Sequence, residues 1–395
     1  MARSPIDGSV LQPAGVLNYR LKGKLLYIVN DAGFFLSHRL PLAVAARMAG
    51  MEVHVATPAD ATSGRIVAEG FHFHAIDIHR WRTNPWREAR SLVAMIRLLR
   101  RLRPDIVHNV TIKPVLYGGI AARLTRQRAV VSAIPGLGTV FIDSSGFGRV
   151  RRAIVKWIYR QALRHPNSGV IFQNEDDLRS FTEAGLTDAR SAVLIRGSGL
   201  DLQSFIPTPL PQGVPVVMLA SRMVWDKGVG EFVRAAMRVH AAGVAARFVL
   251  VGEPERGNPR SVAREQLDEW QRAGIVEWWG RRTDMPEVLS RAYLVCLPSY
   301  REGLPKVLIE AAACGRPLIA ADVPGCREVV RHEANGLLVR VRDSDALAAA
   351  FSDLLQDRVR AENMGRYSRH IAEAEFGVGK VIDDTMRVYE KLLSK

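Results

Sequence analysis

The chain has 395 residues, of which 48% are hydrophobic and 24% charged, and its formal net charge at pH 7 is +15. This length fits about two domains of ordinary size, and the composition excludes a disordered or fibrous protein. No apolar run approaches the roughly 18 residues of a membrane-spanning helix, and the first residues lack the apolar stretch typical of a secretory signal.

Short apolar runs rich in β-branched residues alternate with segments of helical periodicity, which is typical of parallel sheets covered by helices. The predicted strands of the first half are Lys24–Asn30, Glu52–Thr57, Phe71–Ile78, Ile106–Val110, Ala129–Ile134 and Gly169–Gln173. Those of the second half are Val214–Ala220, Arg247–Gly252, Ile275–Trp278, Tyr293–Leu297, Ile319–Ala321 and Leu337–Val341. The predicted helices include Leu36–Ala49, Ser91–Arg101, Asp345–Leu355, Val359–Ala374 and Gly379–Leu393.

The proline-containing stretch Gly197–Gly213 has little periodicity and is the predicted linker between the two halves. We therefore expect an α/β protein of two doubly wound, Rossmann-like domains that face each other across a cleft. The first domain is expected to span residues 1–205 and the second residues 206–375, while residues 376–395 form a helix that returns to the first domain. Ligands of such sheets bind outside the carboxyl ends of the strands, so the loops there carry most weight.

Two glutamates, Glu302 and Glu310, follow the fourth predicted strand of the second half, with seven residues between them. A helix is predicted to begin near Leu304, where Gly303 permits a close backbone approach and Pro305 suits the first turn. The free N–H groups and the dipole at such a helix start favour a phosphate. Glu310 stands in an otherwise apolar run, where an unpartnered carboxylate is costly, so we favour binding of hydroxyl groups over a solvated surface position.

Two cations, Arg222 and Lys227, lie five residues apart in the loop after the first predicted strand of the second half. They suit a diphosphate, because a guanidinium binds oxygens as a fork and an ammonium binds them as a point charge. In so basic a chain, the pair taken alone fits an ordinary surface position equally well. Together with Glu302 and Glu310 in the same half, it predicts an anion-binding site.

The sequence gives little support for a metal site. His72 and His74 fall on one face of a predicted strand, but no third ligand is evident from the sequence, so we favour packing over zinc binding there. We expect no metal ion and no cofactor.

These residues resemble the family-4 retaining glycosyltransferases of the GT-B type. In the second half the resemblance rests on Arg222 and Lys227, on Val251-Gly252, and on the segments PSYREGLPKVLIEA, DVPGCREVV and NGLLV. In the first half it extends over HRLPLA and GLGTVFID. There the chain is most similar to bacterial N-acetylhexosaminyltransferases that act on polyprenyl-diphosphate-linked sugars, such as those adding GalNAc to lipid-linked bacillosamine.

The resemblance implies that the second domain binds a nucleotide sugar, UDP-linked in this group. Arg222 and Lys227 would hold its diphosphate and act in catalysis together with Glu302, which would face the donor sugar. Glu310 would bind the ribose hydroxyls. The other donor-binding residues would be Gly303 and Leu304 beside the sugar, and Gly252 and Arg281 near the base.

The resemblance also implies that the first domain binds the acceptor, a polyprenyl-diphosphate-linked sugar. The acceptor-binding residues would be Gly33, His38, Arg39, Lys113 and Gly138. The acceptor hydroxyl would attack the anomeric carbon from the side of the leaving group, with the departing diphosphate as base, so that the anomeric configuration is retained. The two cations and the helix start would stabilise the charge on that diphosphate.

The charge is concentrated in the first half, where residues 1–205 carry 28 Lys and Arg against 15 Asp and Glu. Trp81–Arg103 and Phe147–His165 combine Arg, Trp and aliphatic residues at helical spacing, as helices lying in a membrane surface do. We therefore expect peripheral binding to the anionic inner face of the cell membrane. Three cysteines without a Cys-x-x-Cys pair agree with a reduced, cytosolic setting.

Two other functions fit parts of the pattern. A nucleotide-sugar 2-epimerase also uses two such domains, although the Arg222/Lys227 pair and the two glutamates disfavour it. Binding of nucleic acid would fit the positive charge, but the sequence contains no zinc module, aromatic RNA-binding strip or homeodomain-like helix, so we expect no nucleic-acid partner.

Overall fold

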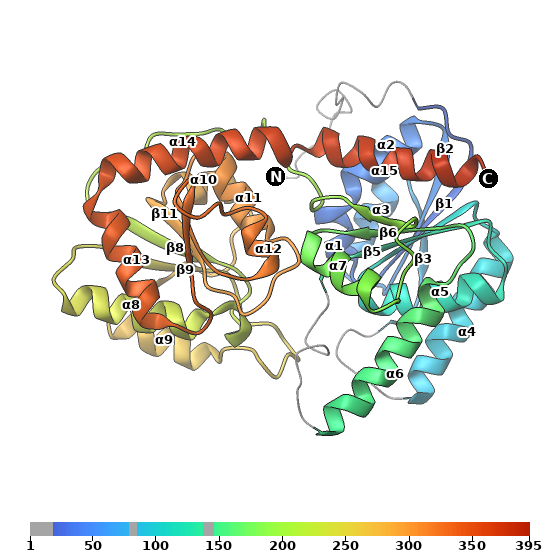
Figure 1. The fold of residues 1–395 in the computed structure, drawn as a ribbon, viewed down its shortest axis with the longest axis horizontal. Helices are drawn as coiled ribbons and strands as arrows, with labels where there is room; N and C mark the ends of the chain where they lie inside the picture. Colours follow the sequence, from blue (N-terminus) through green and yellow to red (C-terminus); the bar gives the residue numbers. More distant parts are fainter. Residues whose placement is uncertain (1–18, 79–84, 137–145) are drawn as a thin grey trace. The chain divides into compact units, whose positions relative to one another are not determined.

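The computed structural model describes residues 19–78, 85–136 and 146–395 (Figure 1). The chain divides into two compact units. The first runs to Gly199 and also contains the C-terminal segment Val378–Lys395, and the second is Leu200–Gly377. The boundaries that we expected after residues 205 and 375 therefore lie after Gly199 and Gly377 in the structure.

The first unit contains a seven-stranded sheet in the order β3-β2-β1-β4-β5-β6-β7, and all of its neighbouring strands are parallel. Its strands are β1 Gly23–Val29, β2 Met51–Thr57, β3 His72–Ala75, β4 Ile106–Val110, β5 Ala129–Ile134, β6 Ser168–Phe172 and β7 Ala192–Leu194. Its helices are α1 Ala32–His38, α2 Leu40–Met48, α3 Ser63–Ala68, α4 Pro85–Leu102, α5 Ile112–Leu124, α6 Gly146–Leu163, α7 Glu175–Glu183 and α15 Val378–Leu393.

Alternate residues of β1 face two different cores in this unit. Leu25 and Tyr27 pack with residues of α2 and α15, whereas Leu26 and Ile28 pack with residues of α4 and α5. Both faces of the sheet are thus covered by helices, which explains why its strands read as continuous apolar runs in the sequence.

The predicted helix Leu36–Ala49 is divided in the structure into α1 and α2. Arg39 separates the two helices, and its backbone angles, φ −125° and ψ −12°, are not those of a regular helix. Pro41 lies in the first turn of α2, where its missing N–H costs nothing, whereas inside a continuous helix it would remove a hydrogen bond. The prediction was wrong because it weighed periodicity above this proline.

The second unit contains a six-stranded parallel sheet in the order β10-β9-β8-β11-β12-β13. Its strands are β8 Val216–Ala220, β9 Arg247–Val251, β10 Glu277–Trp278, β11 Leu294–Leu297, β12 Leu318–Ala321 and β13 Gly336–Val339. Its helices are α8 Val229–Ala241, α9 Arg264–Arg272, α10 Met285–Ser290, α11 Lys306–Ala313, α12 Pro324–Arg327, α13 Ser344–Gln356 and α14 Arg358–Glu375, with a 3₁₀ turn η3 at Trp225–Lys227.

Both sheets reverse their strand order in the manner of a Rossmann fold, beside β1 in the first unit and beside β8 in the second. The structure thus confirms the expected α/β class with two doubly wound parallel sheets. The short strand β7, which closes one edge of the first sheet, was not predicted from the sequence.

Helix α15 completes the core of the first unit although the whole second unit precedes it in the chain. Its residues Val381, Ile382 and Met386 pack in the same core as β1 and α2. The hydroxyl of Tyr389 lies 3.0 Å from that of Tyr27 on β1. Within the described ranges, the structure contains no helix that is both long and apolar enough to cross a membrane.

Candidate active site

The carboxyl ends of β9, β8 and β11 lie next to each other in the second sheet. Backbone hydrogen bonds join the loops that follow these strands. The N–H of Met223, after β8, donates to the carbonyl of Glu253, after β9, at 3.0 Å. The N–H of Tyr300, after β11, donates to the carbonyl of Asp226 at 2.9 Å. This is the switch point of the sheet, where ligands of such folds bind.

An ion pair between Lys227 and Glu302 joins two of these loops. The Nζ of Lys227, at the end of η3, contacts the Oε1 of Glu302, and both side chains are largely buried. Although 75 positions separate them in the chain, the parallel pairing of β8 with β11 brings their loops together. The structure therefore places a cation and a carboxylate that we singled out from the sequence in direct contact.

The backbone beside Lys227 is held by Gly228. This residue has φ +73°, and a Cβ atom on it would lie 2.2 Å from the carbonyl oxygen of Pro298, which follows β11. Such a separation excludes a side chain, so the loop after β8 lies against the backbone after β11 only because position 228 is glycine.

We expect Gly228→Ala to lower both the free energy of unfolding and the turnover of the enzyme. The added methyl group would clash with the backbone of Pro298, at a cost of about 1–3 kcal/mol, and would displace Lys227. Gly243→Ala is the matched control, since Gly243 has φ +74° but open space around its Cα. Equal melting temperatures and equal turnover of the two variants would contradict this account.

The other predicted cation, Arg222, is held by a carboxylate that the sequence reasoning missed. Its Nη1 contacts Oε2 of Glu255, in the loop after β9, and the same oxygen accepts a 2.8 Å hydrogen bond from Nδ2 of Asn258. Glu255 lies four residues past β9, so its place in a loop directly after a predicted strand was the one signal in the sequence that could have drawn attention to it.

Glu310 lies on the buried side of α11, among apolar residues of the second core. Burial raises the pKa of its carboxyl group, and Lys306, whose Nζ lies 3.4 Å from Oε1, opposes that rise. The helix begins at Lys306 with Pro305 as its N-cap, so the predicted start near Leu304 was placed about two residues too early in the chain. The reason is that Pro305 adopts an extended backbone (φ −77°, ψ 108°).

The remaining donor-site candidates line the same edge of the sheet. Gly252 follows β9, and its N–H donates to the carbonyl of Gly280 at 2.8 Å, which brings the exposed Arg281 close to this loop. Gly303 and Leu304, both partly buried, connect Glu302 to α11.

The acceptor-site candidates lie in the first unit, after the neighbouring strands β1 and β4. Gly33 is in the first turn of α1, and the ring of His38 stacks on Phe34 at 4.1 Å. Lys113, in the first turn of α5, forms a 2.6 Å ion pair with Glu88 of α4. Gly138 lies outside the described residues. The assigned roles of these residues, like those of the donor-site candidates, stay predictions.

Arg39 differs from the other acceptor-site candidates because it is only 5% exposed. Burial lowers the pKa of its guanidinium, and the electrostatic interaction with Tyr27 and Tyr389 opposes this shift. Burial also lowers the pKa of His108, whose Nδ1 lies 2.5 Å from the Tyr389 hydroxyl, and the charge of Arg39 lowers it further. A buried cation beside a neutral imidazole ring suits an anion better than another cation.

The three cysteines, Cys296, Cys314 and Cys326, are free and buried in the second unit. Burial raises the pKa of each thiol, that of Cys314 to about 11, so all three are protonated at neutral pH. Thiol groups in this state are poor nucleophiles, so we assign these cysteines no catalytic role.

Two doubly wound sheets, one with cations and carboxylates at its switch point, are typical of proteins that bind phosphorylated ligands. Comparison with known protein families identifies the class of enzyme. Residues 24–165 match the family described as glycosyl transferase 4-like, and residues 214–357 match glycosyl transferases group 1. The chain belongs to the glycosyltransferases and is a hexosyltransferase.

Relatives of known function cover most of the chain. It is 25% identical, over 92% of its length and 98% of the relative's, to N,N'-diacetylbacillosaminyl-diphospho-undecaprenol alpha-1,3-N-acetylgalactosaminyltransferase of Campylobacter jejuni. It is also 25% identical to UDP-Gal:alpha-D-GlcNAc-diphosphoundecaprenol alpha-1,3-galactosyltransferase of Escherichia coli, over 77% of this chain and 79% of that one.

Solved structures of lower identity share the fold. HepE of Anabaena, in complex with UDP and glucose, has a TM-score of 0.74 and 19% identity, with 93% of this chain and 99% of that chain covered. Sucrose-phosphate synthase of Thermosynechococcus elongatus has a TM-score of 0.75 and 20% identity over 94% of this chain and 99% of that chain. These similarities agree with the GT-B fold expected from the sequence.

Proposed function

We propose that this glycosyltransferase moves an N-acetylhexosamine, with retention of configuration, from a UDP-linked donor to a polyprenyl-diphosphate-linked sugar, and that the transfer step needs no metal ion. The observation that carries the proposal is the Lys227–Glu302 pair at the switch point of the second sheet. The substrates named for the Campylobacter jejuni and Escherichia coli relatives, both of them diphosphoundecaprenol-linked sugars, support this choice of acceptor.

The donor diphosphate would bind between the loops after β8 and β11. Lys227 and Arg222 would each exchange part of a carboxylate contact for phosphate oxygens, and the N–H groups at the start of α11 would add to the positive potential. Glu302 would then be free to accept a hydrogen bond from a hydroxyl of the sugar. Glu310, one turn into α11, would accept hydrogen bonds from the ribose hydroxyls.

In the proposed reaction the bond between the anomeric carbon and the diphosphate oxygen breaks, and the acceptor oxygen forms a new bond on the same face of the sugar. The acceptor hydroxyl loses its proton to the departing diphosphate, and UDP leaves. Negative charge grows on the diphosphate as the bond breaks, so cations held in place before the reaction lower the barrier.

The test is a transfer assay with the purified full-length chain. UDP-GalNAc, UDP-GlcNAc, UDP-Gal and UDP-Glc are each offered with polyprenyl-diphosphate-linked bacillosamine or GlcNAc, and the products are identified by mass and by anomeric coupling in NMR. We expect one N-acetylhexosamine to be added with α configuration and EDTA to leave the rate unchanged. Conversion of UDP-GlcNAc without acceptor would instead indicate an epimerase, and an inverted product would contradict retention.

We also propose that α4 and α6 dock the first unit on an anionic membrane surface. Trp86 on α4 is 82% exposed and Trp157 on α6 is 60% exposed, although tryptophan is usually buried. Exposed arginines, among them Arg87, Arg90 and Arg97, lie on α4 as well. Tryptophan with arginine on the outer side of a helix is typical of an interfacial segment.

The double variant Trp86→Ser/Trp157→Ser is expected to bind phosphatidylglycerol vesicles more weakly in a sedimentation assay, because it loses the interfacial rings. Binding of the wild type should fall as salt is raised, since each basic residue contributes about 1 kcal/mol near an anionic surface. Turnover of a short, water-soluble acceptor should not change. Tyr367→Ser, which removes an exposed aromatic ring of the second unit, is the control, and equal vesicle binding by both variants would refute the docking surface.

A further inference from the structure

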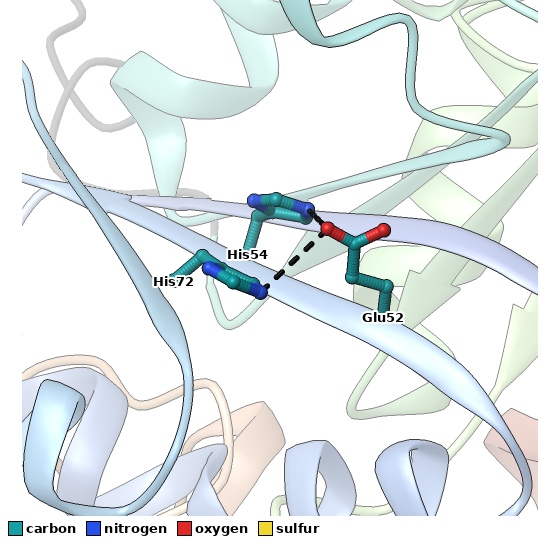
Figure 2. A group of neighbouring side chains, drawn as sticks. All are labelled: Glu52, His54 and His72. Carbon is teal, nitrogen blue, oxygen red and sulfur yellow. Dashed lines mark hydrogen bonds and ion pairs between the residues drawn. The ribbon is translucent and has the colours of Figure 1, made fainter.

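A cluster of imidazole rings and one carboxylate lies near the amino ends of β2 and β3, away from the carboxyl ends where the substrates are expected. Glu52 and His54 occupy alternate positions of β2 and therefore point to the same face of the sheet. On β3, His72 pairs in register with His54. Figure 2 shows the carboxylate of Glu52 directed at the rings of both histidines.

The three ligand atoms converge on one small volume. Oε1 of Glu52 lies 3.0 Å from Nε2 of His54 and 3.6 Å from Nε2 of His72. One nitrogen or oxygen atom from each of the three residues lies within 4.8 Å of the others. A tetrahedral metal ion with bonds of about 2.0–2.1 Å holds its ligand atoms roughly 3.3 Å apart, so small side-chain movements suffice to enclose an ion.

The second nitrogen of His54 is also engaged, by a fourth residue. Its Nδ1 lies 3.0 Å from Nε2 of His74, which is on the same face of β3 as His72. The rings of His72 and His74 both stack on that of His54, with centroids at 4.6 and 5.2 Å. When Nε2 of His54 binds a metal, Nδ1–H donates to His74, and this kind of support is usual for a metal-bound histidine.

The sequence showed only His72 and His74, which left the site without a third ligand. The parallel pairing of β2 with β3 supplies Glu52 and His54, which the sequence reasoning did not consider. We propose that Glu52, His54 and His72 bind one divalent transition-metal ion of the Zn²⁺ type, with His74 as the positioning residue for His54.

The ligand set favours this class of ion over others. Two imidazole groups and one carboxylate suit Zn²⁺, Co²⁺ or Ni²⁺, whereas Mg²⁺ and Ca²⁺ prefer oxygen ligands alone. Because Glu52 and His72 stay about half exposed, water completes the coordination sphere. The ion ties the short edge strand β3 to β2, so its role is structural and separate from sugar transfer.

The test uses the full-length chain without a histidine tag, freed of metal by a chelator and titrated with Co²⁺ and then Zn²⁺. We expect one equivalent of Co²⁺ to give the visible absorption of a tetrahedral site, and Zn²⁺ to displace it and raise the melting temperature. Mg²⁺ should do neither. Glu52→Gln and His72→Ala should abolish both signals, and His74→Ala should weaken binding roughly 10- to 100-fold.

The control is His332→Ala, which removes an exposed histidine lying 3.8 Å from Glu333 in the second unit and should leave the titration unchanged. The side chains of Glu52 and His72 are 46% and 61% exposed, so replacing them should not destabilise the fold. Without metal, the variants should therefore have the same melting temperature as the metal-free wild type. A wild type that binds no more Co²⁺ than Glu52→Gln, or an equal loss in His332→Ala, would overturn the proposal.

Discussion

Lys227→Met is expected to lower kcat/KM for the nucleotide sugar about 100- to 1,000-fold, mainly through kcat. Lys227 lies at the switch point of the second sheet with its ammonium group held against Glu302. In the proposed reaction it faces the diphosphate on which negative charge grows, so it stabilises the transition state more than the bound donor. Steady-state kinetics with varied donor at saturating acceptor measure the effect.

Arg247→Met is the matched control for this variant. Arg247 is the first residue of β9, at the amino ends of the strands, whereas Lys227 lies beyond their carboxyl ends. It also pairs with a carboxylate, Oε1 of Glu277, at 2.6 Å. Exposed pairs of this kind contribute about 0–1 kcal/mol to stability, so its kinetics should match those of the wild type. Unchanged kcat in Lys227→Met, or an equal loss in Arg247→Met, would remove Lys227 from the donor site.

Glu310→Gln is expected to raise the KM for the donor about 10- to 100-fold with a smaller effect on kcat. The amide is a weaker acceptor of hydrogen bonds than the carboxylate, and hydrogen bonds to a charged group contribute about 1.5–3 kcal/mol. Ribose hydroxyls are bound equally before and during the reaction, so the loss falls on binding. Isothermal titration with UDP measures it without turnover.

The pKa of Glu310 adds a test that depends on pH. Because burial raises that pKa, the carboxyl group becomes protonated at a higher pH than an exposed glutamate. The affinity for UDP in the wild type should therefore fall as the pH is lowered through the raised pKa, and Glu310→Gln should lack this step.

Stability should move in the opposite direction to binding in Glu310→Gln. A buried carboxylate with a raised pKa destabilises the folded state at pH values above that pKa, and the amide removes this cost. Thermal melting at neutral pH should therefore show a variant at least as stable as the wild type. A marked loss of stability would mean that Glu310 serves the fold and not the donor.

The fold could be predicted from the sequence because most of its strands are buried on both faces, the short β3, β7 and β10 being the exceptions. Strands of this kind, such as β4 and β11, are uninterrupted apolar runs between helical segments, which fixes both the class and the parallel arrangement. What periodicity could not show was a strand of three residues, β7, or the break that Pro41 imposes between α1 and α2.

The candidate site was predictable to the extent that its residues follow strands directly. Lys227 and Glu302 were recognised because each lies in a loop after a predicted strand of the same sheet. Glu255 was missed because its partner, Arg222, comes from a neighbouring loop, and the sequence does not state which loops touch. The same limit hid Glu52 and His54, because strand register decides which residue lies beside His72.

The position of α15 has a consequence for how the chain folds as it is synthesised. The first unit cannot bury Tyr27 and the rest of its β1 core until α15 has left the ribosome, since α15 forms part of that core. The second unit, Leu200–Gly377, is complete earlier. We therefore expect the second unit to fold first, although the N-terminal domain usually does, and a chain that is cut short before α15 should leave an apolar surface of the first unit open to chaperones.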